Sequence, residues 1–252
     1  MRNAPPVTDV PARAEALARR AAALVDPEMR VAYVRHELAR LAPGDLADLL
    51  LVVVGRAETK EKPHLELLLA LAVALEDPEN VPLRNAAMAI AAARGHSEVV
   101  ELLRDAEVAT EDQVARVPDF GKGRPLTLGE RKSLARKNDR DLIARVLRDP
   151  HPDVIRILLG NRALVERDVV RLCARRPVSP DVIREVFCSP RWMVRYEVRR
   201  AIVLNPHTPL GISMRLCRLL TRQDAKRVAQ SSELHPDLRT ACRRTSAGAV
   251  LH

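Results

Sequence analysis

One turn sequence occurs twice in the C-terminal half of the chain, as Arg176-Pro177-Val178-Ser179-Pro180 and as Asn205-Pro206-His207-Thr208-Pro209. In both copies a cysteine follows twelve residues after the first member. All four cysteines fit this phase when units begin near residues 161, 176, 205 and 230: Cys173, Cys188, Cys217 and Cys242. Unit lengths in this range are typical of stacked helical repeats. We therefore expect an α-solenoid of degenerate repeats in which the four cysteines face the core.

The composition of the 252 residues favours helices. Hydrophobic residues make up 47% of the chain, but aromatic residues make up 2% and there are nine glycines. Strands draw on aromatic and β-branched side chains, whereas the abundant Ala, Leu and Arg are good helix formers. Apolar residues also recur at helical spacing, as in Val31, Val34, Leu38 and Leu41. We expect an all-α protein.

Two segments of the C-terminal half resemble the leucine-rich repeat variant family. They are residues 149–156, Asp-Pro-His-Pro-Asp-Val-Ile-Arg, and residues 198–209, which begin Val-Arg-Arg-Ala and end Asn-Pro-His-Thr-Pro. That family pairs an α-helix with a short 3₁₀-type helix in a right-handed superhelix close to HEAT repeats. The resemblance covers about residues 140–244 and implies a scaffold. A family member carries an iron–sulfur cluster on a separate cysteine-rich segment, which this chain lacks, so no cofactor is expected.

A shorter stretch of the N-terminal half, residues 91–103, resembles the middle of an ankyrin repeat. In that motif Gly95-His96 would make the turn between two antiparallel helices. The likeness covers about half of one repeat and has no second copy in the chain. We interpret it as a helical hairpin and not as an ankyrin array.

The chain is expected to have four parts. Residues 105–125 lack periodic apolar positions and contain the turn-rich run from Pro118 to Pro125, which is typical of a boundary. Thr127 and Glu130 fit a capping box at the start of the next helix. The expected parts are a disordered tail (1–10), an N-terminal helical array (11–104), a linker (105–126) and a basic C-terminal repeat solenoid (127–252).

The net charge of +9 is unevenly distributed. Residues 121–252 hold 28 Lys and Arg against 13 Asp and Glu, a balance of +15, whereas residues 1–120 have a balance of −6. Such asymmetry suggests an anionic partner for the C-terminal half, or contact between the acidic half of one molecule and the basic half of another. Arginines that merely cover solvated helix faces would give the same balance.

We expect partner-binding residues in two clusters of the basic half. The first is a basic loop and helix: Lys122, Arg124, Arg131, Lys132, Arg136 and Lys137. The second surrounds the one tryptophan: Arg191, Trp192, Arg195, Tyr196 and Arg199. Trp192 and Tyr196 are four residues apart, so they would share one helix face. Their rings would either stack on a base or lipid headgroup, or fill the core between repeats.

The sequence carries no catalytic or metal-binding motif: it has no HExxH, GxSxG or Walker loop, and no CxxC pair. Its most apolar runs, residues 49–54 and 67–75, are far shorter than the ~18 residues of a membrane helix, and no apolar segment follows the N-terminus. We therefore expect a cytoplasmic, non-enzymatic scaffold that docks an acidic protein, without metal, cofactor or membrane insertion. Binding to duplex nucleic acid through its phosphates is the alternative, and an enzyme resembling the HEAT-like alkylpurine DNA glycosylases is a distant third.

Overall fold

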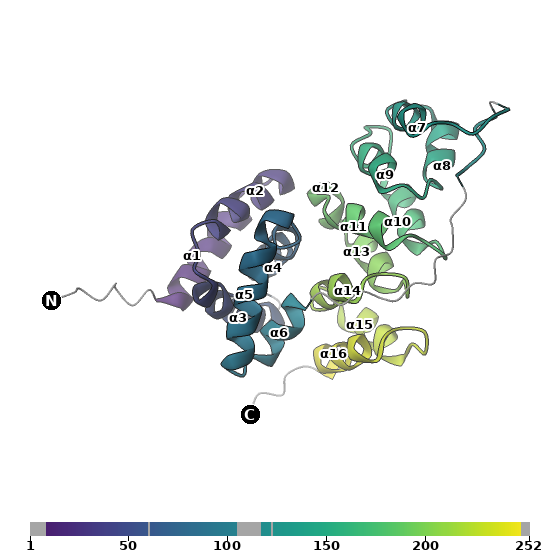
Figure 1. Ribbon diagram of the computed structural model, residues 1–252. Helices are drawn as coiled ribbons and strands as arrows, with labels where there is room; N and C mark the ends of the chain where they lie inside the picture. Colours follow the sequence, from purple (N-terminus) through teal and green to yellow (C-terminus); the bar gives the residue numbers. More distant parts are fainter. Residues whose placement is uncertain (1–8, 60, 105–116, 122, 248–252) are drawn as a thin grey trace. The chain divides into compact units, whose positions relative to one another are not determined.

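The computed structural model describes residues 9–59, 61–104, 117–121 and 123–247 (Figure 1). Within these ranges lie sixteen α-helices and one 3₁₀ helix, and no strand. The all-α fold predicted from the composition is confirmed. The chain divides into two compact units, residues 1–104 and 105–252.

The first unit is built around one nearly uniformly apolar helix. The helices of this unit are α1 (Val10–Ala23), α2 (Pro27–Leu38), α3 (Pro43–Glu58), α4 (Lys62–Ala74), η1 (Pro78–Asn80), α5 (Val81–Ala93) and α6 (Ser97–Leu103). Helix α4 packs against α1, α2 and α3. Residues 67–74 of α4 are all buried, because a helix that is apolar on every face has no side to offer to water.

Aspartates fix where two of these helices begin. The carboxylate of Asp26 accepts the N–H of Glu28 at 2.8 Å, so it caps α2, which satisfies a donor that the helix itself leaves open. Asp9 caps α1 in the same way. As a result α1 begins at Val10, the last residue of the segment expected to be disordered; residues 1–8 lie outside the described residues.

A glycine makes the turn between the last two helices of the first unit. Gly95 has a φ of 75° between α5 and α6, a conformation that glycine adopts without the usual steric cost, and these two helices pack against each other.

In the segment expected to be a linker, residues 105–116 and 122 lie outside the described residues. The described residues from 117 to 126 contain no helix, and Phe120 among them is buried.

The second unit is a succession of short helices. They are α7 (Leu128–Ala135), α8 (Arg140–Val146), α9 (Pro152–Leu159), α10 (Glu166–Ala174), α11 (Pro180–Phe187), α12 (Pro190–Met193), α13 (Tyr196–Val203), α14 (Leu210–Cys217), α15 (Arg222–Gln230) and α16 (Pro236–Ala247). They follow chain order along the unit, from α7–α9 at one end to α14–α16 at the other (Figure 1). Helix α9 packs between α7 and α11, and α10 packs against α13.

A proline turn recurs at nearly constant intervals in this unit, at the start of α9, α11, α14 and α16. The pentapeptide Pro-Asp-Val-Ile-Arg occupies residues 152–156 and 180–184, the first turns of α9 and α11. Pro209 precedes α14 and Pro236 begins α16, so these four prolines follow one another at intervals of 28, 29 and 27 residues. Proline suits this position because the first helical N–H has no partner within the helix.

The proline turns keep the units predicted near residues 176 and 205, which begin four residues before Pro180 and Pro209, but not the units predicted near 161 and 230. Cys173 lies in α10, which does not begin with the proline turn, whereas Cys217 and Cys242 lie in α14 and α16, which do. Cys188 is the residue that follows α11. Three cysteines are buried, but Cys188 is only half-buried, so the expectation that all four face the core holds for three.

Candidate functional site

Arg131 was expected to bind a partner, but it is a structural residue of the second unit. Its side chain is 10% exposed, and Nη1 donates to both carboxylate oxygens of Asp149 at 2.6 and 2.8 Å. Asp149 also accepts the backbone N–H of His151. The pair joins α7 to the turn that precedes α9, and removing one partner would leave a buried charge uncompensated. Arg131 therefore does not form part of a binding surface.

Two more cations of the first cluster are neutralised by nearby carboxylates. Lys132 Nζ lies 2.7 Å from Asp153 Oδ2 and lowers the pKa of that carboxyl. Arg124 forms two hydrogen bonds to Glu130, at 2.6 and 3.0 Å. Together with the N–H and hydroxyl of Thr127, Arg124 lowers the pKa of Glu130 to about 2. Both ion pairs are partly solvated, so they contribute little to stability, but they reduce the net charge of this surface.

The remaining members of the first cluster are Arg136, Lys137 and Lys122. Arg136 and Lys137 are exposed just beyond α7, where Arg136 donates to the carbonyl of Lys132 at 3.2 Å. Lys122 lies outside the described residues. The loop and helix that the sequence singled out as the densest basic patch therefore offer two exposed cations without a carboxylate partner within the described part of the chain.

Trp192 is a core residue. Its side chain is 3% exposed, and its indole N–H donates to the carbonyl of Leu159 at 2.9 Å. The guanidinium of Arg191 lies 4.6 Å from the ring centroid, in cation–π contact, and donates to the same carbonyl. The ring cannot stack on a base or cover a lipid headgroup, and the alternative considered from the sequence, a ring that fills the core, is the arrangement observed.

Trp192 and Tyr196 do not share a helix, because α12 ends at Met193 and α13 begins at Tyr196. The hydroxyl of Tyr196 donates to Asp224 Oδ2 at 2.5 Å and so links α13 to α15. Arg199 donates to the carbonyl of Met193 at 2.5 Å, and burial lowers its pKa. In the second cluster only Arg195 is fully exposed.

Many arginines in this chain bind the C-terminal ends of helices. Seven of those in the described ranges donate to a carbonyl in or just after the last turn of a different helix: Arg30 to Ala21 and Leu24 (α1), Arg84 to Leu75 (α4), Arg175 to Leu147 (α8), Arg191 to Leu159 (α9), Arg199 to Met193 (α12), Arg176 to Leu204 (α13) and Arg239 to Ser231 (α15). The last carbonyls of a helix lack partners within it and carry partial negative charge. A large part of the arginine content therefore serves the fold.

Four exposed cations of the second unit without an ion pair in the described ranges lie on α10, on α8 or directly after α8; the others are Arg136, Lys137, Arg162, Arg195, Arg222, Lys226 and Arg243. Arg145 and Arg148 belong to α8 and the turn after it, and Arg167 and Arg171 to α10; all four are exposed. None forms an ion pair with any residue in the described ranges. We call these four, together with half-buried Arg175, the arginine patch.

Helix geometry aligns the arginine patch. Arg167, Arg171 and Arg175 follow one another at intervals of four residues and so lie on one stripe of α10. Arg175 reaches back to the carbonyl of Leu147 at the end of α8 (3.1 Å). Burial, and the like charge of Arg148 beside it, lower the pKa of Arg175. That like-charge contact marks a place where positive charge is concentrated, although Arg167 of the patch also interacts electrostatically with Asp168 and helps to lower the pKa of that carboxyl.

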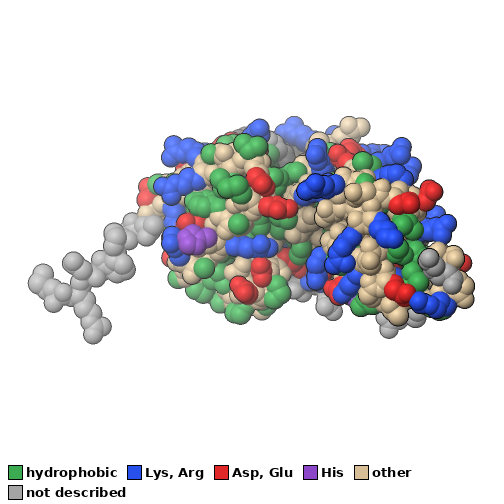
Figure 2. All heavy atoms as spheres, turned by 90° about the horizontal axis from the view of Figure 1, so that it is seen from above, with side chains coloured by type: hydrophobic (Ala, Val, Ile, Leu, Met, Phe, Trp, Pro, Cys, Tyr) green, Lys and Arg blue, Asp and Glu red, His purple; other side chains and the backbone are tan. Residues whose placement is uncertain are grey.

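Other parts of the surface carry Lys and Arg side chains next to Asp and Glu side chains. On the face seen in Figure 2, Lys and Arg side chains are scattered among Asp and Glu and do not gather in a single field. In the second unit, ion pairs of this kind join neighbouring helices: Lys132 with Asp153, Arg156 with Glu185, Arg140 with Asp168 and Arg200 with Asp224. Sequence reasoning missed the arginine patch, although the four-residue spacing of three arginines in α10 was a signal that could have found it.

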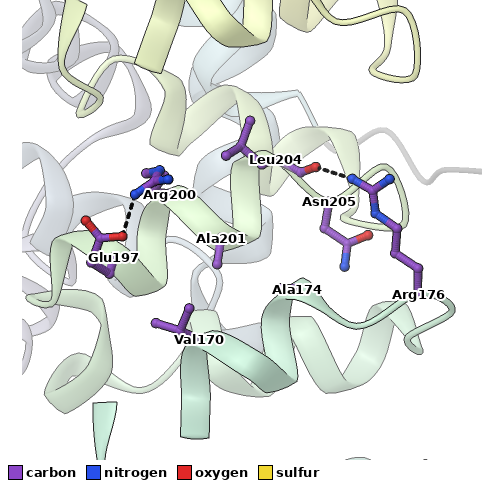
Figure 3. Close-up of a pocket in the computed structure, with 8 residues that line it drawn as sticks. All are labelled: Val170, Ala174, Arg176, Glu197, Arg200, Ala201, Leu204 and Asn205. Atoms are coloured by element: carbon purple, nitrogen blue, oxygen red, sulfur yellow. Dashed lines mark hydrogen bonds and ion pairs between the residues drawn. The ribbon is translucent and has the colours of Figure 1, made fainter. Parts of the chain in front are cut away.

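A cavity of about 200 Å³ lies between α10 and α13. Figure 3 shows Val170 of α10 on the side facing Ala201 of α13, and Ala174 of α10 and Leu204, the residue after α13, also line the cavity. Arg200 stands near one end, 2.6 Å from Glu197, and Arg176 stands at the other, where it donates to the carbonyl of Leu204 at 3.0 Å. The cavity is thus apolar in its middle and bounded by guanidinium groups, and α10 carries the arginine patch on the adjoining face.

Nothing in the described ranges brings together three potential metal ligands among His, Cys, Asp and Glu. In those same ranges, no helix combines the length and the hydropathy required to cross a membrane. Comparisons of the chain with models of protein families, with curated proteins and with solved structures gave no significant match.

Proposed function

We propose that this protein is a non-enzymatic interaction scaffold whose second unit is an α-solenoid of degenerate, HEAT-like helical repeats. The recurrence of proline-led helices at 27 to 29 residues supports the repeat architecture, since intervals of this size are typical of solenoids. Solenoids expose long helix faces on which partners dock. The partner is an acidic protein segment, and its binding surface is the arginine patch on α8 and α10.

The observation that carries the proposal is the set of exposed arginines without carboxylate partners. Most cations of the second unit are occupied by carboxylates or by helix ends, whereas Arg145, Arg148, Arg167 and Arg171 are not. Arginine is well suited to such a role because its planar guanidinium binds carboxylates through two parallel hydrogen bonds. A surface of this kind steers an acidic partner toward itself and selects against basic ones.

The size of the patch favours a protein over duplex nucleic acid. If all four exposed arginines each neutralised one phosphate, the logarithm of the DNA affinity would fall with the logarithm of salt at a slope of about −3.6. A fourfold rise in salt would then weaken binding roughly 150-fold. A protein partner can add buried apolar contacts, which resist screening better than exposed charges do.

The test is a pair of charge-reversal variants. Arg167→Glu with Arg171→Glu removes the stripe on α10. The matched control is Arg222→Glu with Lys226→Glu on α15, two exposed cations with the same four-residue spacing. Binding is measured by fluorescence anisotropy with a labelled Glu-rich peptide and with a labelled DNA duplex, at low and at physiological salt.

We expect the α10 variant to weaken peptide binding by about tenfold or more, which corresponds to ~1.4 kcal/mol, and the α15 variant to change it by less than about twofold. Equal losses in both variants would mean that only net charge matters and would overturn the proposed site. A DNA complex that is stable at physiological salt and lost in the α10 variant would favour the nucleic-acid alternative instead.

A further inference from the structure

The cavity between α10 and α13 adjoins the arginine patch. On α10, the cavity residues Val170 and Ala174 flank Arg171 in sequence, one residue before it and three residues after it. Ala174 follows Arg171 by three residues and so lies on a neighbouring strip of the helix surface, whereas Val170, directly before Arg171, points about 100° away from it. A segment that binds Arg171 therefore passes directly beside the cavity.

The dimensions of the cavity suit one side chain and not a cofactor. Its volume is about 200 Å³, below the ~300–1,000 Å³ of typical small-molecule sites but above the ~150 Å³ of a cavity that holds a benzene ring. The small side chains of Ala174 and Ala201 create the space, and half-buried Val170 and Leu204 complete an apolar lining. A single leucine or phenylalanine side chain fits a space of this kind.

Each end of the cavity carries a guanidinium group that is paired with one or two carboxylates. At one end Arg176 pairs with Glu233, but the two side chains are 46% and 61% exposed, so the pair is weak and an incoming carboxylate can replace it. At the other end Arg200 is shared between Glu197 and Asp224. Glu197 is the one acidic residue among those that line the cavity within the described chain, and Arg200 already neutralises it. The charge pattern complements an apolar residue with acidic neighbours.

Building on the proposed function, we propose that this cavity receives a large apolar side chain of the acidic segment, with carboxylates on either side of it bound by Arg171 and Arg176. The apolar contact supplies affinity that survives at physiological salt, and the arginines supply selectivity for an acidic sequence. The recognised motif is therefore an acidic stretch interrupted by one leucine or phenylalanine.

The experiment uses two labelled peptides and two variants of the full chain. One peptide is Glu-rich with a single central Leu, and the other has Ala in place of that Leu. Ala174→Leu fills the cavity from an exposed position at the end of α10, and Ala144→Leu places the same extra bulk on an exposed alanine of α8, outside the cavity. Circular dichroism checks that both variants remain helical.

With the natural chain, the Leu peptide is expected to bind about tenfold more tightly than the Ala peptide, the gain expected from burying part of a leucine side chain. Ala174→Leu should abolish this preference and Ala144→Leu should preserve it. The charge-reversal variant Arg167→Glu with Arg171→Glu should weaken both peptides and leave their ratio unchanged.

The two proposals fail in different ways. If neither peptide binds, the proposed function is wrong. If both peptides bind equally, the acidic-partner function stands and the cavity inference is overturned. If Ala174→Leu leaves peptide binding intact but converts a dimer into a monomer in sedimentation experiments, the occupant is a second copy of the chain and the inference is likewise overturned.

Discussion

Asn161→Ala should destabilise the second unit far more than its small change in volume suggests. The side chain is 6% exposed. Its amide nitrogen donates to the carbonyls of Ala135 and Lys137, both at 2.9 Å, and its amide oxygen accepts the N–H of Ala163 at 2.9 Å. One side chain thus joins the end of α7 to the turn after α9.

The expected magnitude follows from these three bonds. Each intramolecular hydrogen bond contributes about 1 kcal/mol net, and the alanine variant leaves two carbonyls and one N–H without their partner. The predicted loss is about 3 kcal/mol. In a domain of this size, that loss corresponds to a fall in Tm of about 6–12 °C.

The assay is thermal and urea unfolding followed by circular dichroism, with Asn138→Ala as the control because Asn138 is exposed. Asn205→Ala should match Asn161→Ala, since Asn205 donates to the carbonyls of Cys173 and Arg175 and accepts the N–H of His207. The same device therefore joins α10 to the turn after α13. A loss below about 0.5 kcal/mol for Asn161→Ala, the range of ordinary surface substitutions, would refute the reasoning.

Three further outcomes test the packing and the electrostatics. Emission from Trp192 should be blue-shifted and resist acrylamide quenching, and an emission typical of solvated indole would contradict its burial. Cys188 should react first with a thiol reagent, because Cys173, Cys217 and Cys242 are buried, and equal rates at all sites would contradict the assigned exposure. Burial raises the pKa of the Cys173 thiol, and a hydrogen bond to Cys217 together with burial raises the pKa of the Cys242 thiol, so these two should react slowly. Burial raises the pKa of Asp168, but Arg140 and the Val165 N–H outweigh it and the net pKa is lowered, so its stabilisation is present above the unfolded pKa of about 3.9 and is lost on acidification. Arg140→Gln should therefore flatten the fall of the urea midpoint below about pH 5, and an unchanged slope would contradict the assignment.

Local signals in the sequence predicted local structure well. The capping box at Thr127 and Glu130 is formed by both of its hydrogen bonds, because each partner lies within one helical turn of the other. The all-α fold followed from the composition, because helix propensity is likewise a local property of each residue. The units predicted near 161 and 230 do not match the proline turns, because the register rested on cysteines, which are small and are buried in helices of either kind, whereas the prolines mark helix starts.

The binding residues were harder to predict, because sequence shows the sign of a charge but not its partner. Arg131 and Asp149 are 18 positions apart, and Lys132 and Asp153 are 21 apart. Only the packing of α7 on the turn before α9 brings these pairs together. For Trp192 the sequence left a binding role and a core role open, and its packing against the end of α9, where its indole N–H donates to the carbonyl of Leu159, places it in the core.

The charge of the second unit is in part a consequence of its architecture. A unit made of helices with seven to twelve residues, apart from the four-residue α12, has many helix ends per residue, and every C-terminal end presents carbonyls without partners. Arginine satisfies these carbonyls with its long side chain, and Arg175, Arg191 and Arg199 do so without an ion pair to a carboxylate in the described residues. Net charge therefore overstates the capacity of such a protein to bind anions. The part relevant to binding is the remainder, the arginines of α8 and α10 that have neither a carboxylate nor, Arg175 apart, a helix end to bind.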